Sequence, residues 1–205
     1  MNPKILDHFK NHDAILYEAA LLYDEPLELK VREDLFSHLC EDIVGQQLSG
    51  RVSDVIFGRF IKLFPGKKIV PKHVRKKTVE ELRTVGMSNA KARYIIDLAT
   101  KVDDGEVTLE HLEEKSNEEV IVELTKVKGI GPWTAEMFLM FSLGRPDVFS
   151  TGDLGLKRGI QKLYKIKKEP TTKQLLKIST PWSPYRTYAC CVLWDILDVN
   201  QNTKP

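Results

Sequence analysis

The feature that most constrains the fold is the recurrence of apolar residues at spacings of three and four along most of the chain. This spacing is typical of helices with one buried face, and no convincing strand alternation extends beyond four residues. The best strand candidate, LELKV at 27–31, is short. We therefore expect an all-α fold, with loops at 64–73 and 102–111. Helices are predicted over residues 3–22, 32–48, 51–63, 78–85, 89–101, 117–127, 132–143, 153–163, 171–178 and 184–198.

Size and composition narrow the class of protein. A chain of 205 residues, 42% of them hydrophobic, can bury a core as one compact unit of one or two lobes. No apolar run approaches the roughly 20 residues of a membrane span. The first ten residues, MNPKILDHFK, lack the apolar stretch of a signal peptide. We expect a soluble intracellular protein that does not bind membranes.

The cysteines argue against several metal and redox sites. There are three, Cys40, Cys190 and Cys191, and none belongs to a C-x-x-C pair. An odd number with this spacing does not support a disulfide framework, a zinc knuckle or a four-cysteine iron–sulfur cluster.

Charge is distributed unevenly along the chain. The net charge is +2, but residues 124–205 hold 13 Lys and Arg against 6 Asp and Glu. An excess of basic residues of this kind usually forms a solvated face. A polyanionic partner on the C-terminal side is the alternative that the excess of positive charge leaves open.

Two glycines precede a helix in the stretch KVKGIGPWTAEMF, residues 126–138. Glycine has no Cβ to block an approaching group, and Pro132 suits the first turn of a helix. Amides of Gly129 and Gly131 at a helix N-terminus would hold an anion such as a phosphate. The alternative is a tight turn between helices with no ligand.

Asp153 stands where the next helix begins, after Thr151 and Gly152. Taken alone, this position is that of a helix N-cap. The positive end of the helix also stabilises a carboxylate in its charged form, so a chemical role is open as well.

Four blocks in order resemble the helix-hairpin-helix (HhH-GPD) DNA glycosylases, and within them the alkylbase, 3-methyladenine DNA glycosylase II (AlkA-like) branch. The resemblance covers about residues 30–200, and the blocks occur with the spacing of the family. They are EDIVGQQLSGRVS at 41–53, GMSNAKARYIIDLA at 86–99, VKGIGPWTAEMFLMFSLGRPDVFSTGD at 127–153 and PWSPYRTYACCVLW at 181–194.

The resemblance implies roles for residues of the reaction site. Asp153 matches the catalytic aspartate of the family, which stabilises the sugar cation that forms as the base leaves. Trp133 and Trp194 match aromatic walls of the base pocket, although core packing is the ordinary role of a tryptophan. Met137 and Leu154 stand where the branch has pocket tyrosines, so we expect a less aromatic pocket.

The resemblance also implies DNA contacts. Gln47 would fill the gap left by a flipped nucleotide, flanked by Gln46 and Ser49, unless it only caps a helix end. Arg186 would reach DNA or hold the C-terminal helix, and we favour the second. Amides near Gly129, Gly131 and Thr134 would bind phosphate. Backbone carbonyls of Thr125, Val127 and Gly129 would hold Na⁺ or K⁺ at the hairpin, residues 127–132, and no other cofactor is required.

The sequence therefore predicts a monofunctional DNA glycosylase for alkylated bases in base excision repair. Trp133 replaces the Schiff-base lysine of the lyases, so no lyase activity is expected. The fold would be a single two-lobed domain with a cleft between lobe A, about 30–125, and lobe B, about 1–29 plus 126–205. We expect a monomer acting on double-stranded DNA that contains damaged bases, in the bacterial cytoplasm (nucleoid-associated) or a eukaryotic nucleus. The alternatives are a glycosylase for deaminated or oxidised bases and a non-catalytic protein that binds damaged DNA.

Overall fold

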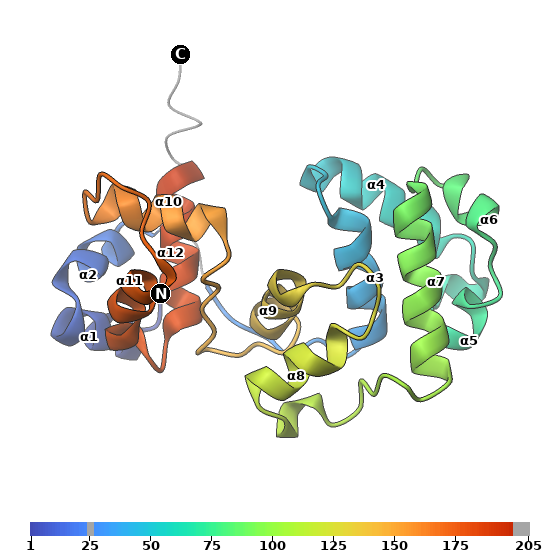
Figure 1. Ribbon diagram of the computed structural model, residues 1–205, viewed down its shortest axis with the longest axis horizontal. Coiled ribbons are helices and arrows are strands. Elements are labelled where there is room, and N and C mark those ends of the chain that lie inside the picture. Colours follow the sequence, from blue (N-terminus) through green and yellow to red (C-terminus); the bar gives the residue numbers. More distant parts are fainter. Residues whose placement is uncertain (24–26, 199–205) are drawn as a thin grey trace, which may run out of the picture. The chain divides into compact units, whose positions relative to one another are not determined.

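The computed structural model describes residues 1–23 and 27–198, and within them it contains helices and no strand (Figure 1). The all-α prediction is confirmed. The strand candidate at 27–31 is wrong, because this segment is irregular. A lone short strand would leave its backbone groups without the ladder that pairs them.

The described chain divides into two compact units. Unit 1 contains residues 1–30 and 144–205, and unit 2 contains residues 31–143. The boundary lies after Leu143 rather than near residue 125, where the sequence placed it. The reason is that the helix following the hairpin packs against helices of unit 2. The predicted cleft between the lobes stays a prediction.

Unit 1 is built from the two chain ends. Its helices are α1 (Pro3–His12), α2 (Ala14–Leu21), α10 (Leu154–Leu163), α11 (Thr172–Ser179) and α12 (Arg186–Asp198). Helix α12 packs against α10 and α2. The single helix predicted over 3–22 is wrong, since Asp13 interrupts it. The Asp13 carboxylate caps α2 through the Leu16 amide and also accepts hydrogen bonds from Tyr164 and Trp182.

Unit 2 gathers around α7 (Asn89–Asp103), which packs against α3 (Leu35–Gly45), α5 (Pro71–Val74) and α6 (Val79–Arg83) (Figure 1). Helix α4 (Gly50–Ile61) follows α3. The pair α8 (Asn117–Leu124) and α9 (Pro132–Phe141) completes the unit. The short α5 lies partly in a predicted loop. It forms because Pro71 opens a turn that buries Val74.

Capping residues set many of the helix boundaries. Thr78, Ser116 and Thr171 each form a capping box with the side chain three residues later. The three cysteines are free and buried. Within the described residues, no helix has the length and apolar character to cross a membrane.

Candidate active site

Asp153 lies in unit 1 at the N-terminus of α10, and its side chain is buried. Its Oδ1 atom accepts a hydrogen bond of 2.6 Å from the Leu156 amide and one of 3.1 Å from the indole Nε1 of Trp194. The aspartate is therefore a helix cap, as its position alone suggested. Two donors also fix its carboxylate, which is what a preorganised electrostatic group needs.

Close packing between α10 and α12 holds this pair in place. A Cβ added at Gly155 would lie 3.0 Å from Asp153 Oδ1 and from the Trp194 indole. One added at Gly159 would lie 2.7 Å from the Leu193 carbonyl. Both glycines therefore allow the two helices to approach. Leu154, next to Asp153, is 61% exposed, and its role as a wall of the base pocket stays a prediction.

The glycine hairpin lies in unit 2 between α8 and α9. Gly129 adopts a φ of +84°, and a Cβ there would lie 2.1 Å from the ring of Tyr94. This position therefore requires glycine on two counts. Gly131 is different. It is the N-cap of α9 at a φ of −93°, and a Cβ there would meet open space. The absence of a side chain at Gly131 leaves room for an approaching group.

Helix α7 fixes the hairpin through residues spaced along one face. Tyr94 packs on Gly129, Asp97 accepts the Lys128 amide at 2.9 Å, and Lys101 donates to the Lys126 carbonyl at 2.5 Å. Sequence reasoning assigned no role to these side chains. The signal that could have found Tyr94 and Asp97 is their spacing of three within the block at 86–99.

Gln46 joins α3 to the hairpin. Its side-chain amide donates to the Gly129 carbonyl at 2.8 Å and approaches the Thr134 hydroxyl at 3.5 Å. Lys91, at the start of α7, donates to the Val44 and Gln46 carbonyls at 2.8 and 2.6 Å. These bonds fix the end of α3 against both the hairpin and α7. Gln46 thus has a structural role beside any contact with DNA.

Gln47 follows in a left-handed conformation, with a φ of +58°, and is exposed. This conformation is uncommon for a residue with a side chain and occurs where the surroundings determine it. Ser49 is the N-cap residue of α4, is exposed, and makes no side-chain cap bond. The backbone therefore presents Gln47 to solvent beside the hairpin contact of Gln46.

A pocket of about 390 Å³ opens in unit 2 between α3 and α9. Trp133, which is 46% exposed, and Met137 line it from α9. Thr134 and both glutamines line it as well, so the structure brings together most of the residues that the sequence assigned to base and DNA contacts in this unit. Its complete lining is Glu41, Asp42, Gly45, Gln46, Gln47, Leu48, Ser53, Trp133, Thr134 and Met137.

The pocket contains a carboxyl group that sequence reasoning did not identify. The Oδ2 atom of Asp42 is buried and has no hydrogen-bond partner among the described residues. Burial, with a smaller contribution from the charge of Glu41, raises the pKa of the Asp42 carboxyl to about 7. The signal by which the sequence could have identified Asp42 is its position, four residues before Gln46 on the same helix face.

Arg186 holds the C-terminal helix. Its guanidinium donates to the Asp147 carboxylate from Nε at 2.6 Å and from Nη2 at 3.0 Å. Ser183 donates to the same carboxylate. The favoured structural role is confirmed by this bidentate pair, which joins α12 to the loop before Asp153.

The proposed cation ligands can be compared with their existing bonds. The Gly129 carbonyl accepts from Gln46, and the Val127 carbonyl accepts the Ile130 amide at 3.1 Å. A carbonyl oxygen has two lone pairs, so each keeps one for an ion. Whether a cation binds here stays a prediction; with the Thr125 carbonyl the predicted ligands would all be oxygen atoms, which hard cations prefer.

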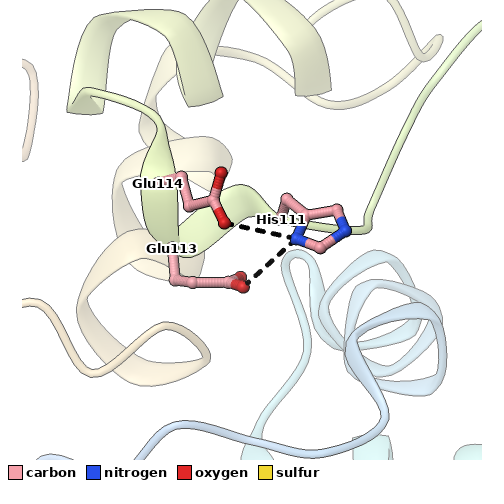
Figure 2. Close-up of side chains that lie close together, drawn as sticks. All are labelled: His111, Glu113 and Glu114. Carbon is pink, nitrogen blue, oxygen red and sulfur yellow. Dashed lines mark ion pairs between the residues drawn. The ribbon is translucent and has the colours of Figure 1, made fainter.

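One other group of potential ligands occurs in the described part of the chain. Figure 2 shows His111 with Glu113 and Glu114, whose carboxylates lie 3.8 and 3.4 Å from the imidazole Nδ1. All three side chains are at least 65% exposed. Exposed ion pairs of this kind contribute little to stability, and nothing here aims a buried ligand atom at a common centre.

Comparison with known proteins extends over most of the chain. The family model described as HhH-GPD superfamily base excision DNA repair protein matches residues 40–184. The chain is 35% identical to DNA-3-methyladenine glycosylase 1 of Schizosaccharomyces pombe, over 85% of this chain and 77% of that protein.

Two solved structures agree with this match. One is the S. pombe 3-methyladenine DNA glycosylase in complex with abasic DNA, with a TM-score of 0.85 and 31% identity over 98% of this chain and 100% of that one. The other is a DNA-3-methyladenine glycosidase from Bacillus halodurans, with a TM-score of 0.82 and 36% identity over 98% of this chain and 92% of that one.

Proposed function

Because the chain belongs to the HhH-GPD superfamily of base excision DNA repair proteins, we propose that it is a DNA glycosylase for alkylated bases. Its substrates would be bases of the 3-methyladenine and 7-methylguanine type in double-stranded DNA, and its DNA product an abasic site. The relatives that match most of the chain are named 3-methyladenine DNA glycosylases or glycosidases, which supports this activity. The observation that carries the proposal is the buried Asp153 carboxylate, fixed by Leu156 and Trp194.

The chemistry follows from the charge changes in the reaction. An N3- or N7-alkylated purine is already cationic and leaves as a neutral base, so positive charge develops on the sugar. The Asp153 carboxylate stabilises that charge and orients or deprotonates the attacking water. Because two donors already hold the carboxylate, little free energy is needed to orient it during the reaction.

Unit 2 would bind the DNA strand and the flipped base. The target base must leave the stack to be reached. The Trp133 ring provides an electron-rich face for a cationic base. First-turn amides of α9 and the open approach to Gly131 suit a phosphate, and Gln47 would occupy the space that the flipped nucleotide leaves.

A monovalent cation at the Thr125, Val127 and Gly129 carbonyls is part of the proposal. When bound, it would add positive charge beside the hairpin amides. The residues themselves hold the loop: Gln46 fixes Gly129, and Asp97 fixes the Lys128 amide.

Activity as a monofunctional monomer is also proposed. Trp133 carries no amine, so the hairpin offers no group for a Schiff base at this position. Borohydride should therefore trap no covalent protein–DNA adduct under conditions that trap a lyase. A trapped adduct with the unmodified protein would place a lyase nucleophile elsewhere and refute this part of the proposal.

A panel of duplexes tests the function directly. Each carries one lesion, 7-methylguanine, hypoxanthine, uracil or 8-oxoguanine, opposite its usual partner, and strands are scored for alkali-labile sites. We expect cleavage at 7-methylguanine. Cleavage confined to uracil or 8-oxoguanine would assign the enzyme to other lesions. Binding without cleavage of any duplex would indicate a non-catalytic damage-binding protein.

A further inference from the structure

An apolar groove of about 820 Å³ lies in unit 1, where α2 meets the last turns of α10 and α12 (Figure 1). One face of α2 forms a wall of the groove and contributes four side chains at helical spacings: Ile15, Glu18, Ala19 and Leu22. The ends of α10 and α12 line it as well. The groove is therefore at the opposite end of α10 from Asp153, and the proposed reaction does not use it.

Helix α2 is more apolar than its surroundings explain. Its sequence, AILYEAAL, contains one charged residue, and a helix that is apolar on nearly all sides is ordinarily buried on nearly all sides. Within the described part of the chain, only Leu16 and Ala20 of α2 are buried. Ile15 and Leu21 are half exposed, and Leu22 is 82% exposed. Apolar side chains that gather on a surface in this way mark an interaction site.

The charges at the groove are mainly negative. The carboxylates of Glu18 and Asp195 line it. Among the described residues, Lys162 is the one basic side chain in the lining, and its ammonium donates to the Ile196 carbonyl. Helices α2 and α12 carry no basic residue in their last turns, so their negative ends add to the same field. The groove thus favours a cation beside apolar surface and opposes a nucleic acid or an anionic membrane.

We propose that this groove is a docking site for another protein, which presents a short amphipathic helix with basic residues beside its apolar stripe. Apolar side chains of the partner, spaced by three and four, would cover Ile15 and Leu22, and its lysines or arginines would face Glu18 and Asp195. Because α2 has eight residues and spans about 12 Å, two to three turns of the partner would fill the groove. The inference goes beyond the proposed function, since it adds a protein partner to the DNA substrate.

Two other occupants fit the groove less well. A second copy of the chain would bring the same two carboxylates against Glu18 and Asp195, and like charges oppose each other. The chain's own residues 199–205, VNQNTKP, contain one large apolar side chain, that of Val199. Neither offers both the apolar stripe and the several basic residues that the groove favours.

The probe is a displayed library of helical peptides of about 15 residues, a length at which an isolated helix begins to be stable in water. The library is selected on the full chain and counter-selected on Leu22→Ser. This substitution changes a side chain that is already exposed, so the variant should remain folded. We expect the enriched peptides to share apolar residues at spacings of three and four together with lysine or arginine.

Fluorescence anisotropy of one enriched peptide then measures each contribution. Leu22→Ser should weaken binding by about tenfold or more, because the leucine side chain would no longer be buried by the peptide. Leu176→Ser, the same change at an exposed leucine of α11 outside the groove, is the matched control and should not alter the affinity.

The charge contribution has its own pair of variants. Glu18→Gln should weaken binding about two- to fivefold at low salt and by less at high salt. Glu118→Gln, the same change at an exposed position on α8, is the matched control and should have no effect.

Several outcomes would overturn the inference. One is a selection that gives no peptide able to distinguish the parent from Leu22→Ser, and another is enrichment of acidic peptides. A parent that sediments as a dimer, with a monomeric Leu22→Ser variant, would assign the groove to a second copy. Tighter peptide binding by Val199→Ser than by the parent would assign it to residues 199–205.

The glycosylase activity gives an independent readout. Release of 7-methylguanine by Leu22→Ser should equal that of the parent, because the groove is outside the proposed reaction site. A folded Leu22→Ser protein with slower release would place the groove in the reaction and reject the docking role. Failure of the parent to excise any lesion would reject the proposed function and leave the peptide measurements to decide the docking site.

Discussion

The indole N–H of Trp194 donates to Oδ1 of Asp153 across 3.1 Å, and the same oxygen accepts the Leu156 amide at 2.6 Å. The tryptophan that the sequence assigned to a pocket wall thus contacts the carboxylate itself. This relationship makes Trp194 a positioning residue for Asp153. A substitution that removes the N–H donor can test it.

Trp194→Phe keeps a large aromatic ring and removes the donor. Hydrogen bonds to charged groups contribute about 1.5–3 kcal/mol. We therefore expect the single-turnover rate on 7-methylguanine DNA to fall by roughly ten- to a hundredfold, with little change in the dissociation constant for abasic-site DNA. A Phe variant as fast as the parent would show that the Trp194 N–H is not needed to orient the carboxylate.

The two hairpin glycines should respond differently to alanine. Gly129→Ala forces a Cβ against the Tyr94 ring at a positive φ, so we expect a loss of about 2 kcal/mol or more in the free energy of unfolding. Gly131→Ala meets open space at an ordinary φ, so its loss should stay within about 1 kcal/mol.

The affinity for DNA tests the proposed phosphate contact at Gly131. If a phosphate approaches Gly131, its alanine variant should bind abasic-site duplex about tenfold more weakly while remaining folded. Chemical denaturation and fluorescence anisotropy measure the two effects. Unchanged affinity in Gly131→Ala would argue against phosphate binding at this turn.

The sequence predicted most of the fold because the helices carry strong apolar periodicity and local caps. It missed the break at Asp13, since that residue also accepts bonds from Tyr164 and Trp182, which lie about 150 or more positions away. It placed the boundary near residue 125 because periodicity does not show that α9 packs on α8 and α3.

The candidate site was predicted unevenly for the same reason. Asp153 and Gly129 occupy local motifs, a helix start and a tight turn. Lys91, Asp97 and Asp42 act through contacts with residues distant in sequence or through burial in a pocket. A single sequence records the residue type but not which oxygen is buried without a partner.

Gln47→Ala should reduce excision from duplex DNA more than from a single strand. Only the duplex has a gap to fill when a nucleotide flips, and Gln47 is held exposed in a left-handed conformation. Single-turnover rates on matched duplex and single-stranded 7-methylguanine substrates measure the ratio. If both fall equally, Gln47 has a structural role alone.

The pH dependence of stability offers a check on Asp42. Its pKa is raised from 3.8 to about 7 by folding, so the folded state binds more protons than the unfolded chain between these values. The free energy of unfolding should therefore fall as pH rises from about 4 to 7, relative to Asp42→Asn, by at most about 4 kcal/mol. Urea denaturation of both proteins at pH 4.5, 6 and 8 measures the difference. A constant difference across this range would place the carboxyl in water.

The central claim is that the Asp153 carboxylate stabilises the sugar cation, and Asp153→Asn tests it most directly. Asparagine can still cap α10 through the Leu156 amide, so the variant should unfold at nearly the parent temperature and bind abasic-site duplex normally. Loss of one preorganised electrostatic group typically lowers a rate by about 10²–10³-fold. The decisive measurement is the single-turnover rate of 7-methylguanine release by Asp153→Asn and the parent at equal DNA occupancy. We predict a loss of that size, whereas release at nearly the parent rate would show that Asp153 is a helix cap and not the catalytic residue.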